Sequence, residues 1–326
     1  MKKLSLASTA RRVSSVLAIG TMLTAALLST VSIARAEESF TRTQDVIYGR
    51  KFGTALTMDV FTPTQNANGA AVILAVSGGW VSNHDNIQPV FVSELIKRGY
   101  TVFAVVHGSQ PKFTIPECVA DMNRAVRFIR YHAADYKIDG NRIGVTGASA
   151  GGHLSLMLGT AGDEGSADAK DPVDKVSSRV EAVACFFPPT DFLNYGKPGV
   201  KSLGIEPEHR FKPPFDFHTQ DAATKLFKPV DMETREKICK DCSPAYHVSK
   251  GDAPTLIIHG DADQLVPLQQ SELIMEKFKE AGVPAELVVI KGGAHGWPTI
   301  LADFKTIADW FDKYLKPSTA TAQAGQ

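Results

Sequence analysis

A short glycine-rich stretch, Gly147-Ala148-Ser149-Ala150-Gly151, constrains the fold of this chain more than any other feature. It matches the G-x-S-x-G pattern, in which a serine lies on a sharp turn between a strand and a helix. Residues 143–145 are predicted to end a buried strand, and residues 154–158 to form the apolar side of a helix. Five neighbours of the serine are glycine or alanine, as the crowded turn requires. The pattern alone also occurs in plain turns, but this context favours Ser149 as a nucleophile, with helix amides directed at the developing negative charge.

Apolar runs and amphipathic stretches alternate along the rest of the chain. Buried strands are predicted over residues 71–76, 101–106, 142–145, 180–187, 254–259 and 285–290. Helices are predicted over residues 87–98, 116–134, 268–281 and 299–315. Segments 46–48 and 56–61 predict an antiparallel hairpin at the start. The alternation predicts an α/β fold with a mostly parallel central sheet, helices on both faces and a site at the carboxyl ends of the strands.

Residues 192–250 break this alternation. They combine prolines, aromatic residues and charges of both signs without a clean strand, and they are too many for a simple connection. We expect them to form a helical cap or lid inserted over the sheet. Residues 37–326 are predicted to form a single domain with this insertion, and the small polar residues after Lys316 to form a frayed end.

The first 36 residues have the composition of a secretory signal. Four basic residues within the first 12 positions precede an apolar run over 16–28, and Ala34-Arg35-Ala36 gives a small-x-small cleavage pattern. A membrane anchor is the alternative, but the run is shorter than the ~20 residues that span a bilayer. We expect a cleaved, bacterial-type signal, a periplasmic or secreted protein, and no stable membrane anchor after cleavage.

Charge argues against nucleic acid as a partner. The chain is 44% hydrophobic and 21% charged, which is typical of a globular protein with a sizeable core. The signal holds five basic residues and no acidic ones, so its removal leaves 30 Lys and Arg against 35 Asp and Glu, a net charge of −5. Such a chain has no basic footprint for nucleic acid.

The chain has four cysteines, at positions 118, 185, 239 and 242. Export makes disulfides possible. The spacing Cys239-Lys240-Asp241-Cys242 favours a structural disulfide that closes a small loop, rather than a redox pair. No second Cys or His pair stands at ligand spacing, so metal binding is disfavoured. Cys118 and Cys185 are expected to be buried thiols. We expect neither a metal nor an organic cofactor.

A serine hydroxyl needs a neighbouring base to attack near neutral pH, and histidine suits this role because its pKa lies close to working pH. His295 is the strongest candidate, because it lies in the loop Gly292-Gly293-Ala294-His295-Gly296-Trp297 directly after a predicted strand. A plain surface-loop histidine is the alternative. Among the rivals, His107 is expected to line the pocket, His153 to pack behind the serine and His259 to bond within its own turn.

The imidazole needs a carboxylate that orients it and stabilises its charged form. Asp261 and Asp263 follow the strand over 254–259, and Asp191 follows an earlier strand. The residues alone leave all three open, with one of the first two expected to brace the turn.

Backbone amides must also stabilise the oxyanion of the reaction. The stretch Ser77-Gly78-Gly79-Trp80 follows the first buried strand, where such a loop is needed. We predict that Gly78 and Gly79 supply amides together with Ala150. A tight turn would use the same two glycines, and the two interpretations are compatible.

From about residue 45 to residue 316, the chain resembles an α/β-hydrolase serine esterase. It is similar to the carboxylesterases related to hormone-sensitive lipase and to the bacterial feruloyl and acetylxylan esterases. The resemblance is carried by residues 147–153, by His259-Gly260 followed by Asp263 and Val266-Pro267, and by Ala294-His295-Gly296. It implies Ser149 as the nucleophile, Asp263 as the acid and His295 as the base, in the usual chain order.

The oxyanion loop departs from this family, which usually has His-Gly-Gly-Gly followed by an aromatic residue. Aligning Trp80 with that aromatic residue places Val76 and Ser77 at the positions of the histidine and the first glycine. The glycine amides are kept, whereas the histidine that braces the loop is missing. The segment 192–250 matches no family signature.

These features predict an exported serine hydrolase that cleaves carboxylic esters through an acyl-enzyme. Its expected substrate is a small-molecule or carbohydrate-linked ester, and the resemblance implies acetyl or feruloyl esters of plant polysaccharides. A prolyl-oligopeptidase-like serine peptidase is one alternative, although such enzymes usually carry a large N-terminal propeller. A non-catalytic binding protein on a hydrolase fold is the other. The sequence leaves acyl specificity, alcohol specificity and oligomeric state open.

Overall fold

The computed structural model describes residues 39–205 and 214–316. The predicted signal over 1–36 and the predicted frayed end after Lys316 lie outside these residues. The main sheet contains β1 (Phe40–Lys51), β2 (Thr54–Pro63), β3 (Ala71–Val76), β4 (Thr101–Val106), β5 (Ile143–Ala148), β6 (Ala182–Phe186), β9 (Thr255–Gly260) and β10 (Ala285–Ile290). The α-helices are α1 (Ser93–Lys97), α2 (Ile115–Tyr131), α3 (Ala150–Ala161), α4 (Met232–Asp241), α5 (Gln269–Ala281) and α6 (Ile300–Leu315).

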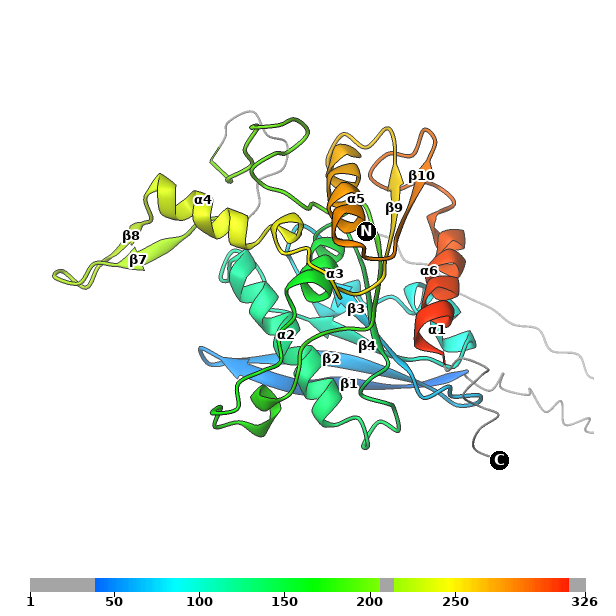
Figure 1. Cartoon of the computed structure of the whole chain (residues 1–326). Helices are drawn as coiled ribbons and strands as arrows, with labels where there is room; N and C mark the ends of the chain where they lie inside the picture. The colour runs from blue at the N-terminus through cyan, green and yellow to red at the C-terminus, as the bar shows by residue number, and fades with distance from the viewer. Residues whose placement is uncertain (1–38, 206–213, 317–326) are drawn as a thin grey trace, which may run out of the picture. The chain divides into compact units, whose positions relative to one another are not determined.

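The strands form one eight-stranded sheet in the order β1-β2-β4-β3-β5-β6-β9-β10. Figure 1 labels β1 to β4, β9 and β10 of this sheet. β2 runs antiparallel to β1 and to β4, and the other neighbours are parallel. The parallel crossovers bring the carboxyl ends of β3, β5, β9 and β10 to one edge of the sheet. The predicted mostly parallel α/β fold is confirmed.

Helices cover both faces of the sheet. On one face, α2, α3 and α5 pack through an apolar cluster that includes Met122, Leu154 and Ile274. On the other face, α1 and α6 contribute Leu95 and Phe311 to a second cluster. Strand β3 is buried at every position because it is covered from both sides. Within the described ranges, no helix has both the length and the apolar character needed to cross a bilayer.

Two elements differ from their predicted bounds. The helix expected over 87–98 begins only at Ser93, because Pro89 opens a short 3-10 turn and the residue before a proline disfavours helical backbone. Strand β1 begins at Phe40 rather than near residue 46. Its pairing with β2 continues past two register shifts until Phe40 lies opposite Pro63.

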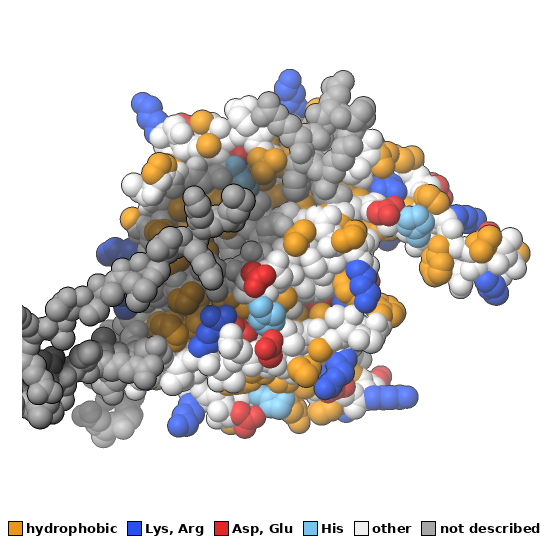
Figure 2. Space-filling view, turned by 180° about the vertical axis from the view of Figure 1, so that it is seen from behind, with side chains coloured by type: hydrophobic (Ala, Val, Ile, Leu, Met, Phe, Trp, Pro, Cys, Tyr) orange, Lys and Arg blue, Asp and Glu red, His pale blue; other side chains and the backbone are white. Residues whose placement is uncertain are grey.

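The insertion between β6 and β9 is less helical than predicted. Its described part contains the hairpin of β7 (His218–Gln220) and β8 (Phe227–Pro229), followed by α4. The hairpin projects away from the sheet (Figures 1 and 2), and Leu226 and Phe227 beside its turn are 70% and 71% exposed. All six strand residues are exposed, so the hairpin has no buried face with which to cover the sheet. The described part of the insertion therefore contains less helix than the sequence predicts, and the lid itself stays a prediction.

The expected disulfide is also corrected. Cys239 and Cys242 are buried thiols at the end of α4. Both side chains belong to the apolar cluster of the α2 face, so packing rather than a covalent link holds this turn. Cys118 and Cys185 are buried thiols, as predicted.

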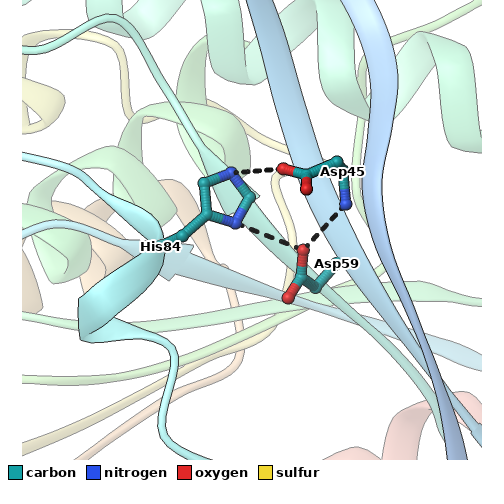
Figure 3. A group of neighbouring side chains, drawn as sticks. All are labelled: Asp45, Asp59 and His84. Atoms are coloured by element: carbon teal, nitrogen blue, oxygen red, sulfur yellow. Dashed lines mark hydrogen bonds and ion pairs between the residues drawn. The ribbon is translucent and has the colours of Figure 1, made fainter.

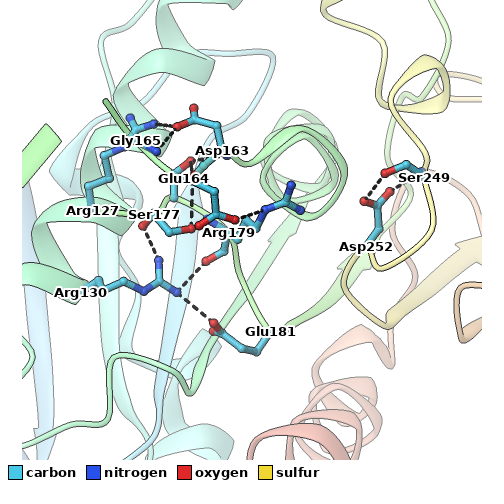
Figure 4. Close-up of polar contacts among 11 residues, drawn as sticks. Arg127, Arg130, Asp163, Glu164, Gly165, Ser177, Arg179, Glu181, Ser249 and Asp252 are labelled. Atoms are coloured by element: carbon cyan, nitrogen blue, oxygen red, sulfur yellow. Dashed lines mark hydrogen bonds and ion pairs between the residues drawn. The ribbon is translucent and has the colours of Figure 1, made fainter. Parts of the chain in front are cut away.

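Arginines of α2 tie down the loop that follows α3 (Figure 4). Arg127 forms an ion pair with Asp163, and Arg130 forms one with Glu181 at 3.0 Å. Arg130 also donates to the Arg179 carbonyl at 2.7 Å. These bonds satisfy loop carbonyls that would otherwise depend on water.

A second polar cluster joins the first hairpin to the turn η1 (His84–Asn86) (Figure 3). The His84 ring lies 3.4 Å from Asp45 and 3.3 Å from Asp59. The three side chains are close enough together to hold a cation, but Arg42 already pairs with the buried Asp59 at 2.6 Å. Because the Asp59 charge is compensated in this way, we interpret the cluster as a structural link.

Glycine at position 144 is required by the packing of α6. A Cβ there would lie 2.6 Å from Cε1 of Phe311. Replacing Gly144 with alanine should therefore lower the free energy of unfolding by about 1–3 kcal/mol in urea denaturation. The same replacement should cost less in a Phe311→Leu background, because the ring is absent. Equal costs in both backgrounds would contradict this contact.

Candidate active site

The turn that carries Ser149 is strained. Its backbone has φ 55° and ψ −119°, outside the regions that suit a residue with a side chain. Such a conformation costs about 1–3 kcal/mol and persists only where the surroundings hold it. The Ser149 amide donates to the Phe186 carbonyl of β6 at 3.0 Å, which helps to hold the turn at the carboxyl end of β5.

Three glycines allow this turn to pack. A Cβ at Gly147 would lie 2.5 Å from the Gly151 backbone, and a Cβ at Gly151 would lie 2.5 Å from the Ala75 carbonyl oxygen. At Gly152 it would lie 2.8 Å from the Phe186 oxygen. The small residues noted in the sequence are therefore required by contacts with two neighbouring strands and with α3.

The structure brings together the three residues predicted as a triad. The Ser149 hydroxyl lies 2.9 Å from Nε2 of His295, and Nδ1 of His295 lies 2.7 Å from Oδ2 of Asp263. Since a carboxylate can only accept, Nδ1 carries the proton and Nε2 accepts from the serine. The Asp263 side chain is fully buried, while that of His295 is 22% exposed. This arrangement can move a proton away from Ser149.

Asp263 is held as a carboxylate. Its Oδ1 accepts the amides of Leu265 and Val266 at 2.8 and 2.9 Å. Burial raises the pKa of Asp263, but interactions with His259, with His295 and with the Val266 amide outweigh burial and keep the pKa well below its ordinary value. Asp263 is therefore ionised at neutral pH and can orient and stabilise a charged imidazole.

The rival carboxylates have other partners. Asp261 accepts the amide of Gly292 at 2.6 Å and so braces the loop that carries His295. Asp191 accepts the amides of Leu193 and Asn194 at 2.8 and 3.1 Å. Of the three carboxylates, Asp263 is therefore the one that the structure places against His295.

The rival histidines are all buried. Nδ1 of His153 accepts from the Trp80 indole at 3.2 Å, and Nε2 donates to the Cys242 carbonyl at 2.7 Å, so His153 packs behind the serine as expected. His259 donates to the Val266 carbonyl at 2.8 Å within its own turn. His107 is not among the described residues that line the cavity beside Ser149, contrary to expectation. It is buried, and its Nε2 faces the Ser77 hydroxyl at 2.8 Å.

The oxyanion prediction needs one correction. The Gly78 amide donates to the Val81 carbonyl at 3.0 Å, and the Val81 amide returns a bond at 2.9 Å. These bonds close a turn with φ 56° at Gly79 and 58° at Trp80, as in a two-residue hairpin loop. Gly78 is thus occupied within its own turn. Among the described residues, the Gly79 amide has no backbone partner, and Ala150 lies at the amino end of α3, where amides lack intrahelical acceptors.

A cavity of about 420 Å³ lies beside the elbow, which is the turn over residues 147–151 that carries Ser149. It is bounded by the oxyanion loop at Ser77 and Gly78 and by the elbow at Gly147 and Ala148. Its apolar lining includes Phe91, Phe186, Ile300 and Phe304, and its polar lining includes Asp85, Asn86 and Gln88. The volume lies within the range of small-molecule sites. Sequence reasoning missed this lining because its residues come from separate elements and share no motif.

Residues 58–278 match the BD-FAE family. This match covers more than half of the chain. The chain belongs to the BD-FAE family. Two relatives from Mycobacterium tuberculosis are a probable carboxylic ester hydrolase, LipM, and an esterase, LipQ. LipM is 25% identical over 72% of this chain and 51% of its own length, and LipQ is 26% identical over 74% and 53%. The chain therefore spans about half the length of these relatives.

Solved structures of similar proteins agree with the family. A truncated carbohydrate esterase from gut microbiota has a TM-score of 0.67 and 28% identity, over 85% of this chain and 98% of that one. An acetyl ester-xyloside bifunctional hydrolase from Caldicellulosiruptor lactoaceticus has a TM-score of 0.63 and 25% identity, over 83% and 93%. These neighbours confirm the α/β-hydrolase fold of the BD-FAE chain.

Burial makes His153 a source of acid sensitivity. Burial lowers the pKa of His153 to about 4, whereas an unfolded chain takes up this proton near pH 6.5. The stability that His153 contributes is therefore complete above about pH 6.5 and is lost as the pH falls towards 4. In a His153→Gln variant, the slope of unfolding free energy against pH should fall by up to about 1.4 kcal/mol per pH unit in this window. Urea denaturation at a series of pH values measures this slope. An unchanged slope would contradict the lowered pKa of His153.

Proposed function

We propose that this chain is an exported serine esterase that hydrolyses acetyl, feruloyl or similar esters of plant polysaccharides. The observation that carries the proposal is the hydrogen-bonded series from the Ser149 hydroxyl through His295 to the ionised Asp263, at 2.9 and 2.7 Å. The strained backbone that presents the serine supports it, because strain of this kind clusters at functional sites. Export is inferred from the signal-like composition of residues 1–36.

In the proposed mechanism, Ser149 Oγ attacks the ester carbonyl while His295 Nε2 takes its proton. The resulting oxyanion accepts hydrogen bonds from the amides of Gly79 and Ala150. As the carbon–oxygen bond to the alcohol breaks, His295 returns the proton to the leaving alcohol. A water molecule then attacks the acyl-enzyme with His295 as base, which releases the acid and restores Ser149. Asp263 stabilises the imidazolium in both halves of the cycle.

Three observations support a carbohydrate-linked ester as the substrate. The cavity beside the elbow is much larger than an acetyl group needs, and its phenylalanine and isoleucine side chains suit an apolar or aromatic group. The Thr146 hydroxyl lies among the lining residues and has no hydrogen-bond partner in the described part of the chain, so it can bind a polar group of the ligand. The structural neighbours include enzymes named for carbohydrate and acetyl xyloside esters.

Covalent labelling and a substrate panel test the proposal. A fluorescent phosphonate should label the wild-type protein, and Ser149→Ala should abolish labelling because the nucleophilic oxygen is lost. Turnover is measured on p-nitrophenyl esters of graded acyl length, on methyl ferulate and on acetylated xylan. Faster cleavage of a matched peptide anilide than of the ester would favour a serine peptidase. Labelling that survives Ser149→Ala, or no turnover of any ester, would reject the proposal.

The two aspartates of one loop offer a matched comparison. Asp263→Asn should lower kcat by about 10⁴-fold, because an amide cannot stabilise the imidazolium and favours the wrong tautomer. Asp261→Asn makes the same chemical change at the residue that braces Gly292, and we expect a loss of about tenfold or less because the proton path stays intact. Steady-state kinetics on p-nitrophenyl acetate measure both. Similar losses in the two variants would contradict the assignment of the acid.

A further inference from the structure

The oxyanion loop, Ser77 to Ser82, needs external support. Its turn places both Gly79 and Trp80 at positive φ, and for a residue with a Cβ this costs about 1–2 kcal/mol. The two bonds between Gly78 and Val81 close the turn but do not attach it to the rest of the protein. The Trp80 indole attaches the loop to His153 of α3 at one point, and further contacts are needed to hold the rest of its backbone.

The segment His107 to Gln110, directly after β4, supplies this support at four points. Nε2 of His107 bonds to the Ser77 hydroxyl at 2.8 Å, and Ser109 Oγ accepts the Ser82 amide at 3.0 Å. The Gln110 amide donates to the Trp80 carbonyl at 3.3 Å, and its side chain donates to the Gly79 carbonyl at 2.5 Å. The contacts run from the first residue of the loop to the last.

These bonds bear on the amide proposed for the oxyanion hole. The oxygen and hydrogen of one peptide group point in opposite directions, so a bond that fixes one of them also fixes the other. Val81 fixes the Gly78 carbonyl and hence the direction of the Gly79 amide, while Gln110 fixes the peptide that follows. His107 anchors the start of the loop through Ser77.

His107 is built as a neutral acceptor. Its Nδ1 donates to the Gly108 carbonyl at 2.6 Å, which leaves Nε2 to accept the Ser77 proton. The charged groups nearby are Lys51 and Asp121, which pair with each other at 2.6 Å, and Asp121 also accepts the Gly108 amide at 2.8 Å. Burial, helped by the Lys51 charge, lowers the pKa of His107 to about 4, so it stays neutral at neutral pH.

We propose that His107 and Gln110 are positioning residues for the oxyanion loop. Val76 ends β3 and Ser77 begins the loop, at the positions where the resembling family has a histidine and its first glycine. His107 contacts this start of the loop from the end of the neighbouring strand β4. The kinetic consequences of this inference rest on the proposed esterase function. The support of the loop by His107 and Gln110 does not depend on that function. Neither residue touches the substrate in this scheme, and both act through the position of the loop that carries the Gly79 amide.

Two substitutions at one position test the brace. His107→Leu keeps the bulk but removes the acceptor, and His107→Gln places an amide oxygen near the position of Nε2. We expect His107→Leu to lower kcat by about 10- to 100-fold, less than or similar to the loss of a whole oxyanion donor, with KM changed by no more than about twofold. His107→Gln should recover most of kcat. His132→Leu is the matched control, since His132 caps the end of α2 and its side chain is only partly buried.

Binding of a trifluoromethyl ketone gives a second kinetic readout, because its serine adduct carries the same oxyanion as the transition state. Its affinity should fall in parallel with kcat in His107→Leu and recover in His107→Gln. An effect confined to KM, or equal losses in the two His107 variants, would overturn the positioning role. If His107→Leu does not fold by circular dichroism, Gln110→Ala tests the same brace, because Gln110 is only half-buried.

Amide hydrogen exchange tests the brace without turnover. A peptide covering residues 77–82 should exchange faster in His107→Leu than in the wild type, and at wild-type rates in His107→Gln and His132→Leu. Unchanged exchange and unchanged kcat in His107→Leu would overturn the inference. A wild-type protein that cleaves no ester would instead reject the proposed function, and faster exchange in His107→Leu would then still establish the brace.

Discussion

The backbone strain at Ser149 is the constraint on which the rest of the site depends. A serine with φ 55° and ψ −119° can persist only if the surrounding elements leave it no other conformation. Backbone atoms of β3, β6 and α3 enclose it so closely that a single Cβ at any of three glycines would collide with them. Close packing, rather than hydrogen bonding alone, therefore holds the nucleophile above the sheet.

The loops around this turn are held mainly by contacts between uncharged groups, and the ionised Asp263 lies at the centre of the site. A Cβ at Gly260 would lie 2.1 Å from the Gly293 oxygen, so glycine allows the loops of Asp263 and His295 to meet. Trp80 joins the oxyanion loop to His153 behind the elbow and packs on Phe192 of the insertion, with ring centroids 5.9 Å apart. Neutral partners suit these buried positions, because an unpaired buried charge would cost more than it contributes.

Prediction from the sequence succeeded where a feature depends on residues close together in the chain. The strand, turn and helix around Ser149 follow from local periodicity and small residues, and resemblance to a family separated Asp263 from Asp261. Prediction failed where a local pattern was compatible with two arrangements. Gly78 and Gly79 both looked like amide donors, but the reverse turn uses the first of them. The spacing of Cys239 and Cys242 predicted a disulfide, whereas both side chains pack in the apolar cluster of the α2 face.

The sequence by itself determined the order of the elements, the elbow and a short set of candidate side chains, because each depends on spacing that the chain carries locally. Only the tertiary structure decided which amide of the oxyanion loop is bonded within its own turn, and that His107 meets Ser77, 30 residues away. It also assembled the cavity from strands, turns and α6. The physical reason is that these features are distances between segments, and such distances are set by how the sheet and its helices pack rather than by any one segment.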